Sequence, residues 1–213
     1  MAKPALLCSK KFLPLFLTQF LGAFNDNLFK NALVILITYR IAAQTGQNAQ
    51  LLVTLAAGLF ILPFFLFSAP AGQMADAYDK AVMARYTKVA EIVLMVIAAV
   101  GFYIQNVNFL LFVLFCMGIQ ATFFGPVKYA ILPQHLEENE LIQGNAYIEA
   151  GTFLAILLGT ILGELLVLKD GGITMVAFGI IAVALLGYIT SRFIPTAPAP
   201  MPGLRTDWNL FRQ

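Results

Sequence analysis

The sequence predicts an all-α membrane protein that crosses the bilayer six times. Apolar residues make up 60% of its 213 residues and charged residues only 11%, with a mean hydropathy of +0.83. A soluble domain carries roughly 25% charged residues, so most of this chain is built to contact lipid. Apolar runs of about 20 residues, the length that a helix needs to cross a bilayer, recur six times.

Short polar turns separate the six expected spans. A polar gap at 44–50 follows the first span, a hydrophilic turn follows the second, and the turn at 105–108 follows the third. An acidic loop leads into the fifth. We expect spans at about 12–41, 51–71, 82–104, 109–132, 141–168 and 173–194, so that residues 1–194 form one six-helix transmembrane bundle.

The start of the chain resembles a signal peptide only in its basic residues. Lys3, Lys10 and Lys11 precede an apolar stretch. No small-residue cleavage site closes a short apolar core, and the stretch continues past Tyr39. We therefore expect the first span to be retained.

Lysine and arginine predict the orientation, because these side chains stay on the cytoplasmic side during insertion. The expected cytoplasmic face collects Lys3, Lys10, Lys11, Lys80, Arg85, Lys88, Lys128, Arg192, Arg205 and Arg212. The opposite face has only Arg40 and Lys169, so both termini are expected in the cytoplasm. Four prolines between Pro195 and Pro202 predict that residues 195–213 begin an extended cytoplasmic linker.

The first span holds the densest set of polar residues. A charged side chain at the bilayer centre costs about 2.5 to 3.5 kcal/mol on insertion scales. Asp26 and Lys30 are four residues apart on one helical face and can pair, and Asn27 lies between them. Two interpretations remain open. Either the charges neutralise each other while asparagines join this helix to a neighbour, or the face lines a water-accessible cavity that contacts substrate or a coupling ion.

Other intramembrane charges lie in the later spans. Lys128 lies near the cytoplasmic end of the fourth span, and Glu149 lies at a similar depth in the fifth. Lys128 either extends to anionic headgroups or binds an anion in the cavity. Extension to the headgroups explains Glu149 less well, because its side chain is short. Glu91 and Glu164 are expected to be structural.

Other function classes have no support in the sequence. Cys8 and Cys116 are expected to act as small apolar side chains and not to form a disulfide or bind a metal. His135, the only histidine, is expected in a solvated loop, so no metal site is predicted. We find no catalytic triad spacing and no phosphate-binding glycine loop, and we expect neither an enzyme nor a cofactor. The net charge of +2 on scattered residues does not favour nucleic-acid binding.

The segment after the second span reads Gly72-Gln73-Met74-Ala75-Asp76-Ala77-Tyr78-Asp79-Lys80. It resembles the signature between the second and third helices of the major facilitator superfamily. In that signature a glycine allows a tight turn, and an acid four residues later contacts helix ends and basic partners. Gly72, Asp76 and Lys80 match this pattern, whereas Ala77 and Asp79 stand where a basic residue and a glycine are usual. The resemblance implies that the matching three residues stabilise one of two cavity orientations.

Three further strings, at 19–27, 125–133 and 144–150, are similar to the lysophospholipid transporter branch of that superfamily, which includes forms fused to acyltransferase and acyl-ligase domains. The glycines Gly151 and Gly159, with Gly163, resemble the fifth-helix signature. The resemblance implies a twelve-helix fold of two six-helix halves with substrate bound between them. This chain would supply the N-terminal half, and a C-terminal half would complete it.

The function implied by the resemblance is alternating-access transfer of a lysophospholipid across a bacterial inner membrane, where a cytoplasmic acyltransferase re-acylates it. Asp26 with Asn27 would meet the headgroup or a coupling cation, Lys128 would attract the phosphate, and Lys30 would tune Asp26. One alternative is a facilitator of a small polar solute or drug, driven by protons through Asp26 or Glu149. Another is a membrane anchor or assembly half that transports nothing.

Overall fold

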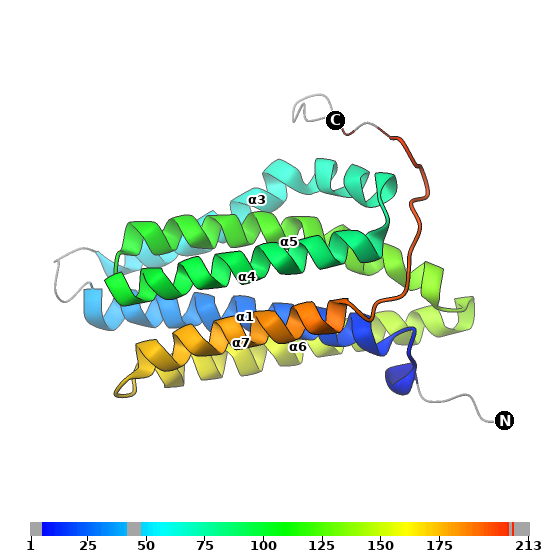
Figure 1. Cartoon of the computed structure of the whole chain (residues 1–213). Helices are drawn as coiled ribbons and strands as arrows, with labels where there is room; N and C mark the ends of the chain where they lie inside the picture. Colours follow the sequence, from blue (N-terminus) through cyan, green and yellow to red (C-terminus); the bar gives the residue numbers. More distant parts are fainter. Residues whose placement is uncertain (1–5, 42–47, 205, 207–213) are drawn as a thin grey trace.

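The computed structural model describes residues 6–41, 48–204 and 206. This part contains six helices long and apolar enough to cross a membrane, which confirms the predicted all-α, six-helix architecture. The helices shown in Figure 1 are α1 (Leu13–Leu36, continued by the π-helical turn η2, Ile37–Ile41), α3 (Ala49–Ala77), α4 (Lys80–Ile104), α5 (Val107–His135), α6 (Glu138–Val167) and α7 (Gly172–Ser191). A short 3-10 turn, η1 (Leu6–Cys8), precedes them.

Side-chain caps begin four of the helices. Asn48, Asp79, Asn106 and Glu137 cap α3, α4, α5 and α6, and each satisfies backbone N–H groups that have no partner within the helix. Because the caps lie in the polar turns, the helices extend beyond the apolar runs. The second helix, for example, ends at Ala77, past the end of the expected span at residue 71.

The connection between α3 and α4 is shorter than predicted. Gly72 lies inside α3, and a Cβ atom built on it would meet nothing within 4 Å. Only Tyr78 and Asp79 separate the two helices. The expectation that Gly72 forms a tight turn is therefore wrong, because α3 continues to Ala77 and the N-cap Asp79 sets the turn instead.

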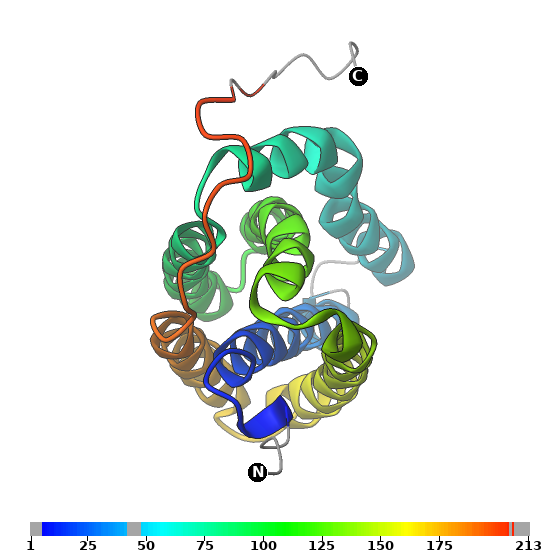
Figure 2. The same ribbon diagram turned by 90° about the vertical axis from the view of Figure 1, so that its right-hand side faces the viewer.

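The helices form one bundle with α1 and α5 inside it. α1 packs along α6 and α7, α5 packs along α3 and α4, and α4 also packs along α7. Figure 2 views the bundle from its end and shows α3, α4, α6 and α7 around the central pair. Pro63 and Pro70 lie inside α3, and in Figure 1 its later half bends away from the bundle.

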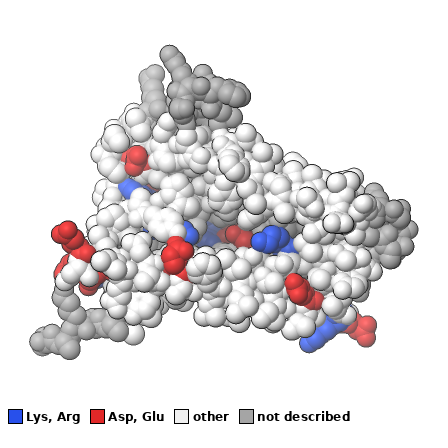
Figure 3. All heavy atoms as spheres, turned by 180° about the vertical axis from the view of Figure 1, so that it is seen from behind, with Lys and Arg blue, Asp and Glu red and all other residues white. Residues whose placement is uncertain are grey.

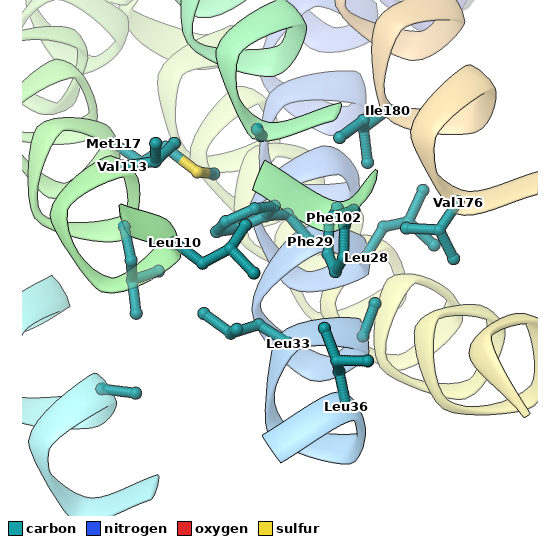
Figure 4. Packing of buried hydrophobic residues seen from close by; sticks show 14 of the residues in the cluster. Leu28, Phe29, Leu33, Leu36, Phe102, Leu110, Val113, Met117, Val176 and Ile180 are labelled. Carbon is teal, nitrogen blue, oxygen red and sulfur yellow. The ribbon is translucent and has the colours of Figure 1, made fainter. Parts of the chain in front are cut away.

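Two apolar clusters fill the bundle interior. The first joins the later parts of α1 and α4 to the first half of α5, and the rings of Phe29 and Phe102 meet there edge to face, with centroids 5.5 Å apart (Figure 4). The second lies near the other end of the bundle and includes Phe12, Ala84 and Ile131. At the level between the two apolar clusters, the buried side chains of α1, α4 and α5 are mostly polar.

That level, which we call the polar layer, holds most of the buried polar side chains. Its members are Thr18, Gln19, Asn25 and Asn27 of α1, Lys88 and Glu91 of α4, and Gln120 and Thr122 of α5. Burial of this kind is costly unless each group finds a partner. The polar layer is therefore the candidate region for a functional site in this bundle.

Glycines bring α6 close to α1. A Cβ at Gly159 would lie 2.5 Å from the backbone oxygen of Phe24, and one at Gly163 would lie 2.6 Å from that of Leu28. No side chain fits at such distances, so the glycines permit close backbone contact, as is common between membrane helices. The glycine row of the fifth span therefore serves close packing of α6 against α1.

The segment after α7 crosses the end of the bundle at which α1 begins (Figure 1). Residues 195–204 contain no helix. The backbone N–H of Lys80 donates to the carbonyl of Ala197 (2.9 Å), and the N–H of Met201 donates to that of Asp76 (3.0 Å). The described part of the proline-rich segment is thus non-helical and is bound to the end of α3 and the start of α4.

Candidate functional site

A cavity of about 390 Å³ opens from the polar layer. It is lined by Gln19, Gly22, Ala23, Asp26, Asn27, Lys30, Phe60, Phe64, Lys88, Glu91, Gln120, Ala121, Phe124, Gly125, Lys128, Thr152 and Ile156. Figure 3 shows acidic and basic side chains gathered across the middle of an otherwise largely uncharged face. Charges of both signs therefore meet in one hollow within helices that are apolar enough to cross a membrane.

Asp26 lines this cavity without a hydrogen-bond partner for its buried Oδ1 atom. It does not pair with Lys30. Among the described residues, the salt bridges within 4 Å join Lys11 to Glu140 and Lys88 to Glu91. The predicted pairing is wrong, because the Lys30 ammonium lies over the ring of Phe60 on α3, 5.4 Å from its centroid.

The asparagines of α1 divide between two roles. The amide of Asn31 donates to Thr160 Oγ1 of α6 (3.0 Å), and that of Asn25 donates to Glu91 Oε1 of α4 (2.9 Å). These two join α1 to its neighbours, as the structural interpretation expected. Asn27 donates to the Ala23 carbonyl of its own helix (2.8 Å) and lines the cavity beside Asp26.

The ion pair between Lys88 and Glu91 is the feature that the sequence reasoning missed. The Lys88 ammonium lies 2.6 Å from Glu91 Oε2, and the two side chains are 1% and 2% exposed. Placing Lys88 among the basic residues of the cytoplasmic face was wrong, since it is buried about two turns into α4. The available signal was the Lys-x-x-Glu spacing inside the expected third span.

Lys128 and Glu149 are close neighbours but do not share the cavity. Lys128 lines the cavity, and its ammonium lies 4.8 Å from the centroid of the Tyr129 ring. The hydroxyl of Tyr129 donates to Glu149 Oε1 on α6. Glu149 is not among the residues that line the cavity. The structure therefore places Lys128, and not Glu149, in the same cavity as Asp26.

The three residues predicted to stabilise one orientation lie outside the cavity, near the bundle end. The ammonium of Lys80 is buried and donates to the Pro198 carbonyl (3.3 Å). Asp76 accepts from Met201 through its backbone. Gly72 lies within α3, one turn before Asp76. Asp76 and Lys80 thus share the segment that follows α7 as a neighbour.

His135 is also held by that segment. It is the last residue of α5 and is half-buried, with Nε2 3.2 Å from the Thr196 carbonyl oxygen. The expectation of a solvated loop histidine is therefore wrong, because the cap of α6 begins only at Glu137 and α5 extends to the turn. Among the described residues, no group of three or more His, Cys, Asp or Glu side chains is placed to hold a metal ion.

A second, larger hollow adjoins the cavity. It has a volume of about 730 Å³ and lies between α3, α4 and α5. Its lining is mostly apolar and includes Met83, Leu94 and Phe123. Gln120 lines both hollows, and its amide donates to the Thr87 carbonyl (3.2 Å). A charged cavity and an apolar hollow thus meet at one residue.

The comparisons with known proteins agree with this architecture. The Major Facilitator Superfamily model matches residues 15–210. The lysophospholipid transporter LplT of Enterobacter sp. (strain 638) is 30% identical over 198 residues, which cover 92% of this chain and 46% of that protein. LplT of Escherichia coli (strain SE11) is 31% identical over 205 residues, covering 96% and 47%. The chain spans about half the length of these relatives.

A solved structure is similar in fold. The crystal structure of the peptide transporter POT in complex with alafosfalin superposes with a TM-score of 0.65 at 17% identity. The match covers 91% of this chain and 41% of the transporter chain. At this identity the likeness shows a shared fold alone.

Proposed function

This chain belongs to the major facilitator superfamily, and from that premise we propose that it is the N-terminal half of a transporter that moves lysophospholipid across a bacterial inner membrane by alternating access. Its six apolar helices make it a multi-pass membrane protein. The relatives named as lysophospholipid transporters are about twice as long as the chain, which supports a second six-helix half as its partner. Both the family and these names favour transport over catalysis.

The observation that carries the proposal is that a charged cavity and an apolar hollow lie side by side and share Gln120 as a lining residue. Among the described residues, neither Asp26 nor Lys30 nor Lys128 forms a salt bridge, yet all three line the cavity. A lysophospholipid carries a phosphate, a polar headgroup and one acyl chain. Unpaired charges of both signs suit the headgroup, and an adjoining apolar hollow suits the chain. A small polar solute would not need the second hollow.

Four of the polar residues that line the cavity have a proposed role. Asp26, with Asn27 beside it, binds the cationic or hydroxylated part of the headgroup, or a coupling cation. Lys128 attracts the phosphate, because an ammonium stabilises a phosphate oxygen by charge-assisted hydrogen bonding. Lys30, which rests on Phe60, acts on Asp26 through its charge and not by direct contact. The second half supplies the remaining binding groups.

The orientation is also proposed. The bundle end that carries Lys80 and the segment after α7 is placed in the cytoplasm, and with it both termini, because basic residues gather at this end. Asp76 and Lys80 would then stabilise one cavity orientation through their contacts with residues 197–201, together with Gly72 one turn earlier in α3. The transported lipid would meet an acyltransferase, fused or associated, on the cytoplasmic side. The bilayer itself is the other partner.

Uptake of labelled lysophosphatidylethanolamine tests the proposal. Spheroplasts that lack their own transporter would express the full-length parent, its Asp26→Asn variant or a Glu164→Gln control. Glu164 is an exposed acidic residue of α6 that does not line the cavity. Glu164→Gln therefore removes one negative charge, as Asp26→Asn does, but leaves the cavity unchanged. We expect uptake to be lost in the first variant and kept in the second, with equal amounts of protein in the membrane.

Two other outcomes would redirect the account. If the intact parent moves no lysophospholipid, a proton-coupled facilitator of a small polar solute becomes the better explanation. A competition assay separates the two functions, because lysophospholipid should displace a solute only from a lysophospholipid transporter. If a cysteine placed at Asp26 is inaccessible to water-soluble thiol reagents, the anchor or assembly interpretation gains instead.

A further inference from the structure

The carboxylates of Asp26 and Glu91 line the same cavity but differ in their partners. Glu91 is fully engaged, since Lys88 reaches its Oε2 atom at 2.6 Å and Asn25 donates to its Oε1 atom at 2.9 Å. The buried Oδ1 atom of Asp26 has no partner among the described residues. The cavity thus holds one satisfied carboxylate and one that is left open.

Lys88 is held at its position by α1, α5 and α7. A Cβ at Gly22 would collide with its ammonium, and a Cβ at Gly187 would lie 3.6 Å from it. The ammonium also lies 5.2 Å from the centroid of the Phe124 ring. Only a glycine at position 22 lets the side chain reach this point on α1.

That point lies on the face of α1 that carries Asp26. Gly22 and Asp26 are four residues apart, and residues at this spacing are neighbours on one helical face. The Lys88 ammonium beside Gly22 is therefore close to Asp26. If no other carboxylate were present, Lys88 would pair with Asp26, because an unpaired buried charge is strongly unfavourable. In the structure it pairs with Glu91 instead.

We propose that Glu91 is a positioning residue that holds Lys88 away from Asp26, and so keeps Asp26 free for the ammonium group of a lysophospholipid headgroup. The inference rests on the proposed function and deepens it, because it names the chemical group that Asp26 receives. Asn25 completes the arrangement by fixing the second oxygen of Glu91 from α1. Neither Lys88 nor Glu91 needs to touch the substrate in this account.

A purely structural ion pair makes different predictions. Removing Glu91 alone would then lower stability, and removing both charges would restore stability without any specific effect on substrate affinity. In the positioning account, Glu91→Gln frees Lys88 to pair with Asp26 and blocks the ligand. The double variant Lys88→Met/Glu91→Gln removes the competing ammonium and restores binding. The readout that separates the two is the KM for substrate, measured on protein that is inserted and folded.

The experiment uses the full-length parent in spheroplasts that lack their own transporter. We expect Glu91→Gln to raise the KM for lysophosphatidylethanolamine about tenfold, and the double variant to return it to within about threefold of the parent. Lysophosphatidylglycerol, whose headgroup has no ammonium, should be much less affected by Glu91→Gln. Equal loss for both lipids would overturn the headgroup assignment and point to a coupling cation at Asp26.

Two further results would overturn the positioning role. One is an unchanged KM in Glu91→Gln, and the other is a double variant no better than the single one. If Glu91→Gln does not reach the membrane, the KM of the double variant is the test: it must insert with a KM for lysophosphatidylethanolamine within about threefold of the parent, and an inserted double variant with a larger KM overturns the positioning role. Retained uptake by Asp26→Asn would instead refute the proposed function itself, so the two failures are distinguishable.

Discussion

The ammonium of Lys30 lies over the ring of Phe60, 5.4 Å from its centroid, although Asp26 is only one helical turn away on α1. The contact joins α1 to α3 inside the cavity. It leaves both charges of the first helix without a partner of opposite sign within 4 Å among the described residues. The contact is one structural reason why the Asp26 carboxylate has no salt-bridge partner, which the proposed binding role requires.

Replacing Phe60 tests this contact. Phe60→Leu removes the aromatic face, which is worth about 0.5 to 2 kcal/mol to a cation, and frees Lys30 to move toward Asp26. We expect the KM for lysophosphatidylethanolamine to rise severalfold in uptake assays. Phe60→Tyr keeps the ring and should behave like the parent. Equal behaviour of the leucine and tyrosine variants would show that the ring does not position Lys30.

Lys128 is expected to act through its charge. Lys128→Met should raise the KM for lysophosphatidylethanolamine about tenfold or more, because the phosphate loses its cation, whereas Lys128→Arg should retain most uptake. The control is Lys11→Met, which removes the Lys11–Glu140 salt bridge at the bundle end. Pairs of this partly exposed kind contribute about 0 to 1 kcal/mol. Normal uptake by Lys128→Met would remove Lys128 from the site.

The close approach of α6 to α1 predicts a difference between two glycines. At Gly159 an added methyl group would lie 2.5 Å from the Phe24 carbonyl oxygen, so Gly159→Ala should lower stability by about 1 to 3 kcal/mol. At Gly58, inside α3, a Cβ would meet nothing within 4 Å, so Gly58→Ala should stabilise the helix by up to about 1 kcal/mol. Thermal unfolding in detergent measures both, and a stable Gly159→Ala variant would contradict the packing.

Asp79 holds two elements together. Its Oδ1 atom caps α4 by accepting from Ala81 N (2.8 Å), and its Oδ2 atom accepts from Ala197 N (3.2 Å). Asp79→Ala should cost about 1 to 2 kcal/mol through the cap and release the segment after α7. Hydrogen exchange at the Ala197 amide should accelerate in this variant and much less in Asp79→Asn. Unchanged exchange in Asp79→Ala would show that other contacts hold the segment.

The sequence predicts the parts of this molecule that depend on local properties. Apolar runs of bilayer length gave six helices, and the spacing of Asp26 and Lys30 placed both on one face. The partners of these residues depend on other helices. Lys30 meets a ring of α3, and the burial of Lys88 depends on the space that Gly22 of α1 and Gly187 of α7 leave beside its side chain. The three-residue spacing of Lys88 and Glu91 on α4 was visible in the sequence, but periodicity along one helix does not show that the pair is buried against its neighbours.

The prediction of a tight turn at Gly72 was wrong for a related reason. A match to a signature gives residue types, but the helix end depends on capping, and here Asp79 supplies the cap after Ala77. His135 likewise gained its partner from Thr196, which is distant in sequence.

The most direct test of the account is transport by purified protein. The full-length parent and its Asp26→Asn variant would be reconstituted into proteoliposomes, and entry of labelled lysophosphatidylethanolamine would be followed against Glu164→Gln as the control. We predict transport by the parent and the control, and none above empty liposomes by Asp26→Asn. Equal transport by parent and Asp26→Asn would contradict the claim that the open carboxylate of α1 binds the substrate.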